Sequence, residues 1–213
     1  MVYLNTDTVV SGSYVLIASG SPLVKNTIVD FSKKVDDPNA HDDKKTVFDI
    51  SLERNPSKNN PGKPAVGNLG SGSDFASFYQ YAGVPSADFY YIFGYKNETV
   101  FYPVYHSQHD TFNWTVKFVD PKFLFHKAMT QLTGGLLLQF ADAPLLKMDV
   151  ITYAEALNSS LHSLISAYPE ELKDYAGSMN YLRMAVEKFH DTAKTFSTAR
   201  YSYIGALHTI IMF

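Results

Sequence analysis

The hydrophobic pattern of this chain changes its period near Asp149. Before that residue, short apolar runs alternate with stretches in which apolar residues recur at helical spacing, a rhythm typical of α/β domains. After it, apolar residues recur every three or four positions, as they do in long amphipathic helices. The sequence therefore predicts an α/β domain over residues 1–145 and a helical domain over residues 146–213.

Composition limits the classes of function that this chain can have. It has 213 residues, of which 46% are hydrophobic, so it is long enough to bury a core. The 18 Lys and Arg residues against 21 Asp and Glu residues give a net charge of −3, which argues against nucleic acid as a partner. The chain has no cysteine, so any metal must bind His, Asp or Glu. Neither a signal peptide nor a membrane span is expected within these residues.

The first domain is expected to combine short strands with helices. Strands are predicted over residues 2–5, 14–19, 87–93 and 100–104, and helices over residues 23–35, 75–82 and 121–140. Ser21 followed by Pro22 predicts the cap of the first helix. The charged run of residues 33–45 and the polar stretch of residues 54–64 are expected to be solvated loops.

Two histidines and a small-residue loop are the first candidates for chemistry. His106 and His109 follow a predicted strand and lie close in sequence to a tyrosine and a carboxylate. A His pair spaced by three can ligate a metal on a helix, but Pro103 and the strand-like residues around it argue against a helix here. The loop GNLGSGSDF, residues 67–75, matches neither the dinucleotide fingerprint nor the phosphate-binding loop. Both a bare turn and a ligand cradle therefore stay open for this loop.

Three motifs occur in the order seen in one family. They are NTD at residues 5–7, NLGSGSDFASFYQYAGVPSADF at residues 68–89 and YPVYHSQHDTF at residues 102–112. In these motifs the sequence resembles the glutamate carboxypeptidase II and transferrin-receptor family, also called N-acetylated-alpha-linked acidic dipeptidases, over residues 2–198. The resemblance implies part of a mixed-sheet zinc-exopeptidase domain of α/β class, followed by part of a helical, transferrin receptor-like dimerisation domain.

The resemblance also implies roles for three residues in a co-catalytic site with two zinc ions. Asp7 corresponds to a carboxylate ligand of one zinc, and His106 corresponds to the imidazole ligand of the other. Tyr105 would donate a hydrogen bond to the oxyanion that forms during peptide cleavage. Asp110 is either a group that supports a ligand or a solvated carboxylate.

Other parts of the family's site have no counterpart in this sequence. In family order, the second histidine, the bridging aspartate, the glutamate base and a further carboxylate all precede the motif that contains Asp7. The resemblance therefore implies a carboxypeptidase-type enzyme, releasing C-terminal residues from peptides, of which this chain is a piece without activity of its own.

The substrate pocket implied by the resemblance contains Gly72, Ser73, Ile17, Asp88 and Tyr90. Ile17, Asp88 and Tyr90 stand where the acid-selective branch of the family has arginines, and Ser73 stands where it has an asparagine. We therefore do not expect a preference for acidic residues upstream of the scissile bond.

The remaining expectations concern partners and location. The resemblance implies a homodimer formed through the C-terminal helices, on the extracellular or lumenal side of a membrane, as part of a type II membrane protein. Asn97, Asn113 and Asn158 are candidate glycosylation sites, although chance alone predicts roughly 1.7 such sequons in a chain of this composition. The alternative is a non-catalytic, transferrin receptor-like dimeric binding protein, and the retained Asp7 and His106 count against it.

Overall fold

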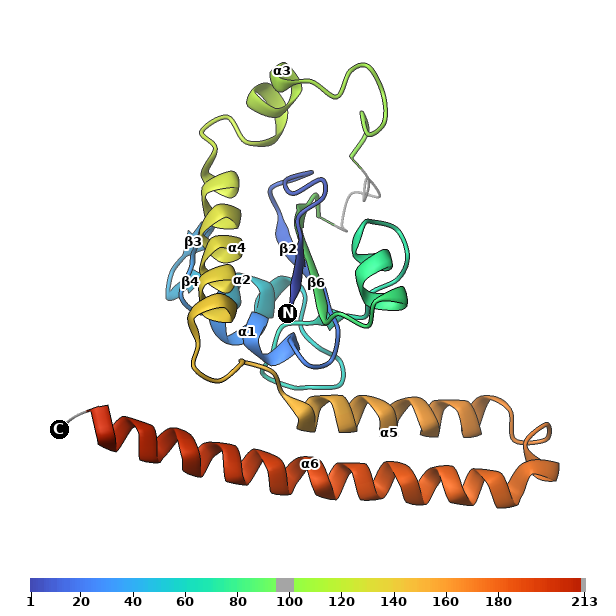
Figure 1. Cartoon of the computed structure of the whole chain (residues 1–213). Helices are drawn as coiled ribbons and strands as arrows, with labels where there is room; N and C mark the ends of the chain where they lie inside the picture. The colour runs from blue at the N-terminus through green and yellow to red at the C-terminus, as the bar shows by residue number, and fades with distance from the viewer. Residues whose placement is uncertain (95–101, 212–213) are drawn as a thin grey trace. The chain divides into compact units, whose positions relative to one another are not determined.

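The computed structural model describes residues 1–94 and 102–211 (Figure 1). The chain divides into two compact units, Met1–Met148 and Asp149–Phe213. The first is a mixed α/β unit and the second is helical. Each is described by itself below.

A four-stranded mixed sheet organises the first unit. Its strands are β1 (Tyr3–Asn5), β2 (Val15–Gly20), β5 (Val66–Gly67) and β6 (Ser86–Ile92), in the order β1-β6-β2-β5. β6 runs parallel to β1 and antiparallel to β2, while β5 runs parallel to β2. Strands that are far apart in sequence therefore lie side by side at the centre of the unit (Figure 1).

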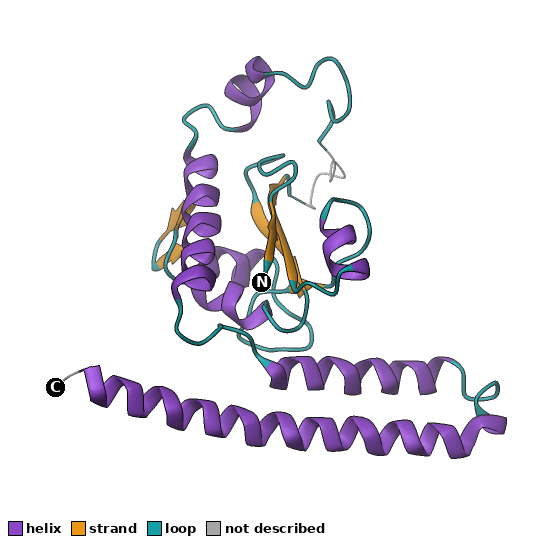
Figure 2. Ribbon diagram, in the orientation of Figure 1, coloured by secondary structure: helices purple, strands orange, loops and turns teal. Residues whose placement is uncertain are grey.

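The two faces of the sheet have different roles, because side chains alternate between faces along a strand. Leu16 and Ala18 of β2 share the buried face with Phe89 and Tyr91 of β6. This face packs against three helices, which lie together on one side of the sheet in Figure 2. They are α1 (Lys25–Ser32), α2 (Val47–Arg54) and α4 (Leu124–Asp142). The other face stays partly open.

The first helix begins later than its sequence predicts. α1 starts at Lys25 after Val24, and no side chain caps it. Ser21 instead forms a turn in which its carbonyl accepts from the Val24 N–H at 3.0 Å. The prediction that Ser21 caps the helix was therefore wrong, because the chain makes this extra turn before it becomes helical.

The charged run of residues 33–45 was wrongly predicted to be a solvated loop. It forms a hairpin of β3 (Asp36–His41) and β4 (Lys44–Thr46). Asp37 within it is buried, and its carboxylate accepts a 2.7 Å hydrogen bond from the hydroxyl of Tyr91. This buried polar contact attaches the hairpin to the sheet, and hydrophobic periodicity gives no sign of it.

Two predicted elements near the undescribed residues 95–101 differ in the structure. A short π-helix, Ser77–Tyr81, replaces the predicted helix around residues 75–82. Phe75 is buried, whereas Phe78, expected on the buried side, is 39% exposed and stacks on the ring of Tyr3. The strand predicted over residues 100–104 lies partly outside the described residues, and its last three residues form turns.

The chain returns to regular structure through α3 (Phe112–Trp114), the π-helix Thr115–Val119 and then α4. The buried carboxylate of Asp120 caps α4, because it accepts from the backbone N–H groups of Leu124 at 2.9 Å and His126 at 3.0 Å. The predicted Asp120–Pro121 start of this helix is close to the observed one.

The second unit consists mainly of two long helices, α5 (Val150–Ala167) and α6 (Ala176–Ile211), which pack against each other (Figure 2). The side chain of Asp149 caps α5 by accepting from the N–H groups of Ile151 and Thr152. None of the helices in the described part of the chain combines the length and apolar character needed to cross a membrane.

Candidate active site

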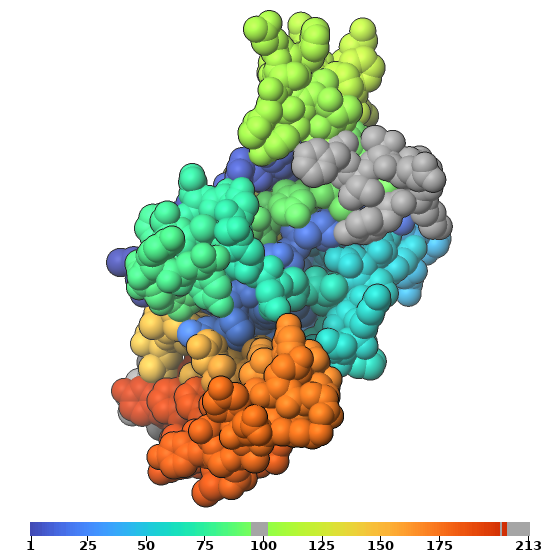
Figure 3. All heavy atoms as spheres, turned by 90° about the vertical axis from the view of Figure 1, so that its right-hand side faces the viewer, coloured from blue at the N-terminus to red at the C-terminus, as the bar shows by residue number. Residues whose placement is uncertain are grey.

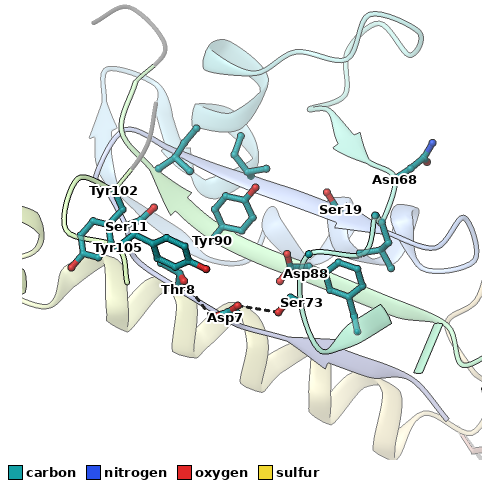
Figure 4. Close-up of a pocket in the computed structure, with 16 residues that line it drawn as sticks. Asp7, Thr8, Ser11, Ser19, Asn68, Ser73, Asp88, Tyr90, Tyr102 and Tyr105 are labelled. Carbon is teal, nitrogen blue, oxygen red and sulfur yellow. Dashed lines mark hydrogen bonds between the residues drawn. The ribbon is translucent and has the colours of Figure 1, made fainter. Parts of the chain in front are cut away.

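The open face of the sheet forms the floor of a cavity of about 460 Å³. Its floor comes from β2 and β6, because Ile17 pairs across the strands with Tyr90, and Ser19 pairs with Asp88. In Figure 3 this face is hollowed between the segment around residues 70–82 and the segment beyond residue 102, with blue atoms of the first strands at the bottom. Figure 4 shows the lining side chains. The lining comprises Asp7, Thr8, Ser11, Ile17, Ser19, Asn68, Leu69, Gly70, Gly72, Ser73, Phe75, Asp88, Tyr90, Ile92, Tyr102 and Tyr105.

Asp7 lies in the turn directly after β1, at the edge of this cavity. Its carboxylate is exposed and is held by two neighbours: Ser73 Oγ donates to Oδ2 at 3.0 Å, and Thr8 Oγ1 donates to Oδ1 at 3.2 Å. Figure 4 shows both bonds. The Asp7 side chain is therefore oriented while keeping acceptor capacity for a further ligand.

Asn5 connects Asp7 to the floor of the cavity. Its side chain is buried, and Nδ2 donates to Ser73 Oγ at 3.0 Å and to Asp88 Oδ1 at 2.9 Å. Sequence reasoning assigned no role to Asn5, although its position two residues before Asp7 on the same strand end was a usable signal. The four side chains form one hydrogen-bonded group that joins β1, β6 and the loop of residues 67–75.

Electrostatics on the cavity floor centre on Asp88. Burial raises the pKa of its carboxyl group, and the nearby negative charge of Asp7 raises this pKa further, while the hydrogen bond from Asn5 opposes both effects. Among the described lining residues, none is Lys, Arg or His. Lys25 contacts the lining residue Asn68 without lining the cavity itself: its ammonium donates to Asn68 Oδ1 at 2.7 Å and to the Val66 carbonyl at 3.1 Å.

The loop of residues 67–75 forms one wall of the cavity. Gly70, Gly72 and Ser73 all line it. A Cβ added to Gly70 or Gly72 would meet no atom within 4 Å. The glycines therefore leave open space at the wall rather than filling a packed position.

The third motif contributes the opposite wall. Tyr105 lines the cavity, and its ring stacks on the ring of His106 with centroids 3.8 Å apart. His106 is exposed, has a φ of 56° in a turn and is not among the lining residues. The turn agrees with the prediction that no helix carries the His106 and His109 pair. Asp110 is also exposed, and its Oδ1 accepts a 2.9 Å hydrogen bond from the Tyr102 hydroxyl.

The donors expected for zinc are a carboxylate at Asp7 and an imidazole at His106, both groups that Zn²⁺ accepts as ligands. Both side chains are exposed, which suits metal binding. Within residues 1–94 and 102–211, however, no three His, Asp or Glu side chains gather into a metal-binding group. The zinc roles of Asp7 and His106 remain predictions.

The candidate glycosylation sites lie outside this cavity. Asn113 in α3 and Asn158 in α5 are both exposed, as an acceptor for a glycan must be. Asn97 lies outside the described residues.

Comparison with curated proteins finds peptidases. The aminopeptidase NAALADL1 of Rattus norvegicus is 32% identical over 197 residues, which make up 91% of this chain and 26% of that protein. The probable glutamate carboxypeptidase AMP1 of Arabidopsis thaliana is 32% identical over 194 residues, with 91% of this chain and 24% of that protein covered. The glutamate carboxypeptidase 2 homolog of Caenorhabditis briggsae is 30% identical over 193 residues, 88% of this chain and 23% of that protein.

This chain spans about a quarter of the length of these curated relatives. No family model matches the sequence. The relatives nevertheless align over about nine-tenths of its length and come from a mammal, a plant and a nematode. The chain therefore belongs to the glutamate carboxypeptidase family.

Proposed function

We propose that the protein containing this chain is a dizinc exopeptidase that releases C-terminal residues from peptides, and that this chain supplies one side of its active site. One observation carries the proposal. Three segments that are far apart in the sequence, containing Asp7, Asp88 and Tyr105, meet around one cavity. They belong to the three motifs on which the family resemblance rests, so the cavity is the natural place for the peptide.

Each residue has a distinct role in this proposal. Asp7 and His106 would each bind a zinc ion, with the further donors coming from the rest of the longer protein. Bound zinc would polarise the scissile carbonyl and make a water molecule acidic enough to attack it. The hydroxyl of Tyr105 would donate a hydrogen bond to the negative charge that develops on the carbonyl oxygen. Ser73 would orient Asp7 through the 3.0 Å bond to Oδ2.

The direction of cleavage can be tested with blocked dipeptides. A carboxypeptidase needs a free C-terminal carboxylate and tolerates an N-acetyl group, whereas an aminopeptidase needs a free amine and tolerates a C-terminal amide. We expect the zinc-loaded full-length protein to cleave N-acetyl-dipeptides and to leave C-amidated dipeptides intact. Cleavage of only the amidated series would change the proposal to an aminopeptidase, and cleavage of neither would favour a non-catalytic binding protein.

We further propose that two copies of the protein associate through the helical unit. Four large side chains on α6, spaced by seven residues, are between 40% and 57% exposed: Leu182, Phe189, Phe196 and Tyr203. Residues seven apart lie on nearly one line along a helix, so these four form a stripe. The inner side of α6, with Val186 and Ala193 buried, already packs in the unit.

An extracellular or lumenal location within a type II membrane protein is proposed on the family resemblance. The exposed Asn113 and Asn158 are compatible with glycosylation there. Glycosylation can be tested by producing the protein in a eukaryotic secretory host and treating it with an N-glycosidase. A loss of mass on treatment shows that a glycan was attached. If Asn113→Gln or Asn158→Gln no longer shows this loss, the substituted residue is the modified site.

A further inference from the structure

The floor of the cavity places an apolar surface beside a carboxylate. Tyr90 and Asp88 are two residues apart on β6, so both point to the cavity side of the sheet, as Figure 4 shows. Ile17 lies opposite Tyr90 on β2. Two residues of extended strand span about 7 Å. A ligand side chain lying along β6 would therefore contact both the Ile17 and Tyr90 surface and the Asp88 carboxylate.

The charge around this floor has one sign. Asp88 is the lining carboxylate that the proposed function leaves without a zinc ion, since Asp7 is assigned to one, and the described lining residues include no Lys, Arg or His. Lys25 contacts the back of the wall, but its ammonium is bound to Asn68 and to a backbone carbonyl and does not line the cavity. An anionic side chain entering here would meet negative charge without a partner, whereas a cation would be attracted.

Asp88 has the capacity to bind such a cation. Its carboxylate accepts hydrogen bonds from the Asn5 amide and from the backbone N–H of Phe89, and an ionised carboxylate offers about four acceptor sites in total. The hydrogen bond from Asn5 also fixes the direction of the carboxylate, so little ordering is needed when a ligand binds.

We propose that Asp88 determines substrate specificity and that the residue on the amino side of the scissile bond carries a lysine- or arginine-type cation. This proposal rests on the peptidase function proposed above. The aliphatic stem of the substrate side chain packs on Ile17 and Tyr90, and its charged end binds Asp88. Lysine fits this arrangement because its flexible four-carbon stem ends in a compact charge.

The test compares dipeptides Xaa-Ala in which Xaa is lysine, norleucine or glutamate, using the zinc-loaded full-length protein. Norleucine keeps the stem of lysine and removes only the charge. A hydrogen bond to a charged group predicts a kcat/KM for the lysine peptide about 10- to 100-fold above that for norleucine. The glutamate peptide is expected to be the poorest of the three.

Two variants and a control identify the residue responsible. Asp88→Asn keeps the shape and the bond to Asn5, and we expect it to reduce the lysine-to-norleucine ratio to about 1. Ile17→Arg adds a cation to the floor and should raise the kcat/KM for the glutamate peptide above that for the lysine peptide. Asp74→Asn, an exposed carboxylate in the neighbouring loop that does not line the cavity, should keep the wild-type ratio.

The outcomes separate the two proposals. Equal rates for lysine and norleucine in the wild-type protein, or an unchanged lysine preference in Asp88→Asn, would overturn the assignment of Asp88 while leaving the peptidase function standing. A lack of turnover of these three dipeptides in a protein that cleaves N-acetyl-dipeptides would also overturn the assignment of Asp88, whereas a lack of turnover of both kinds of substrate would overturn the peptidase function itself.

Discussion

Ser73 Oγ donates a 3.0 Å hydrogen bond to Asp7 Oδ2, across 66 positions of sequence. If Asp7 binds zinc, this bond orients the ligand, and outer partners of this kind typically change metal affinity about 10- to 100-fold when they are removed. We expect Ser73→Ala in the full-length protein to weaken zinc binding by that amount, measured by competition with a chelator. Ser71→Ala, in the same loop but outside the cavity lining, is the matched control. Unchanged affinity in Ser73→Ala would contradict the ligand role of Asp7.

The two histidines of the third motif differ in their surroundings, so their alanine variants should differ in zinc content and in activity. His106 stacks on Tyr105, which lines the cavity, whereas His109 is an exposed residue of the following turn. His106→Ala should remove one zinc equivalent and the peptidase activity of the full-length protein, and His109→Ala should keep both. Metal analysis of the purified variants measures this. Equal losses in the two variants would mean that both imidazoles belong to the site.

The buried pair of Asp37 and Tyr91 predicts a pH dependence of stability. Burial raises the pKa of Asp37, and its hydrogen bonds from Asn39 and Tyr91 only partly oppose this effect. The folded state therefore binds the proton more tightly than the unfolded state, so the free energy of unfolding should fall as the pH rises from about 4 through the raised pKa. Asp37→Asn should not show this fall in the free energy of unfolding.

Urea denaturation between pH 4 and pH 8 measures the free energy of unfolding over this range. Asp36→Asn is the control, because Asp36 is an exposed neighbour in the same hairpin. Its curve of unfolding free energy against pH should run parallel to that of the wild-type protein. A parallel curve for Asp37→Asn would show that the buried carboxylate does not control the pH dependence.

The same hairpin shows which parts of the fold the sequence could not predict. β2 and β6 were predicted closely because their apolar residues alternate or cluster over a strand length, and burial of one face requires that pattern. The β3–β4 hairpin was missed because its residues are mostly polar and polar contacts attach it to the rest of the unit, among them the Asp37–Tyr91 hydrogen bond and the bonds from Asn39 to the carbonyls of Ser13 and Tyr14. A buried polar contact joins residues 54 positions apart and leaves no periodic signal.

The candidate site was also predicted only in part from the sequence. Motif resemblance selected Asp7, Ser73, Asp88 and Tyr105, and the structure brings all four to one cavity. Their chemical roles stay predictions. Asn5 was not selected, because a single buried asparagine in a strand has no spacing pattern, and only the fold brings Ser73 and Asp88 within reach of its amide.

Two adjacent glycines in α4 should respond to substitution with opposite signs. A Cβ on Gly135 would lie 1.9 Å from the ring of Phe31 in α1, so Gly135→Ala must displace that ring and should destabilise the protein by about 1–3 kcal/mol. A Cβ on Gly134 meets nothing within 4 Å. Gly134→Ala should therefore stabilise the helix by about 0.5–1 kcal/mol. Thermal denaturation measures both, and a loss of stability of similar size in each would show that the close approach of α1 and α4 is not the cause.

The exposed stripe on α6 predicts self-association. Phe196 is 56% exposed and lies one heptad from both Phe189 and Tyr203, so it is one of the two inner residues of the described part of the stripe. Burial of an aromatic side chain of this kind at an interface contributes about 1.5–3 kcal/mol, and a carboxylate in its place would have to be desolvated without a partner. Phe196→Glu should therefore weaken the homodimer at least about tenfold, measured by sedimentation equilibrium.

Lys194→Glu, two residues away on the exposed helix surface, introduces the same group outside the stripe and should leave the dimer intact. A wild-type protein that stays monomeric at tens of micromolar, or equal weakening by both variants, would show that the stripe is not the interface.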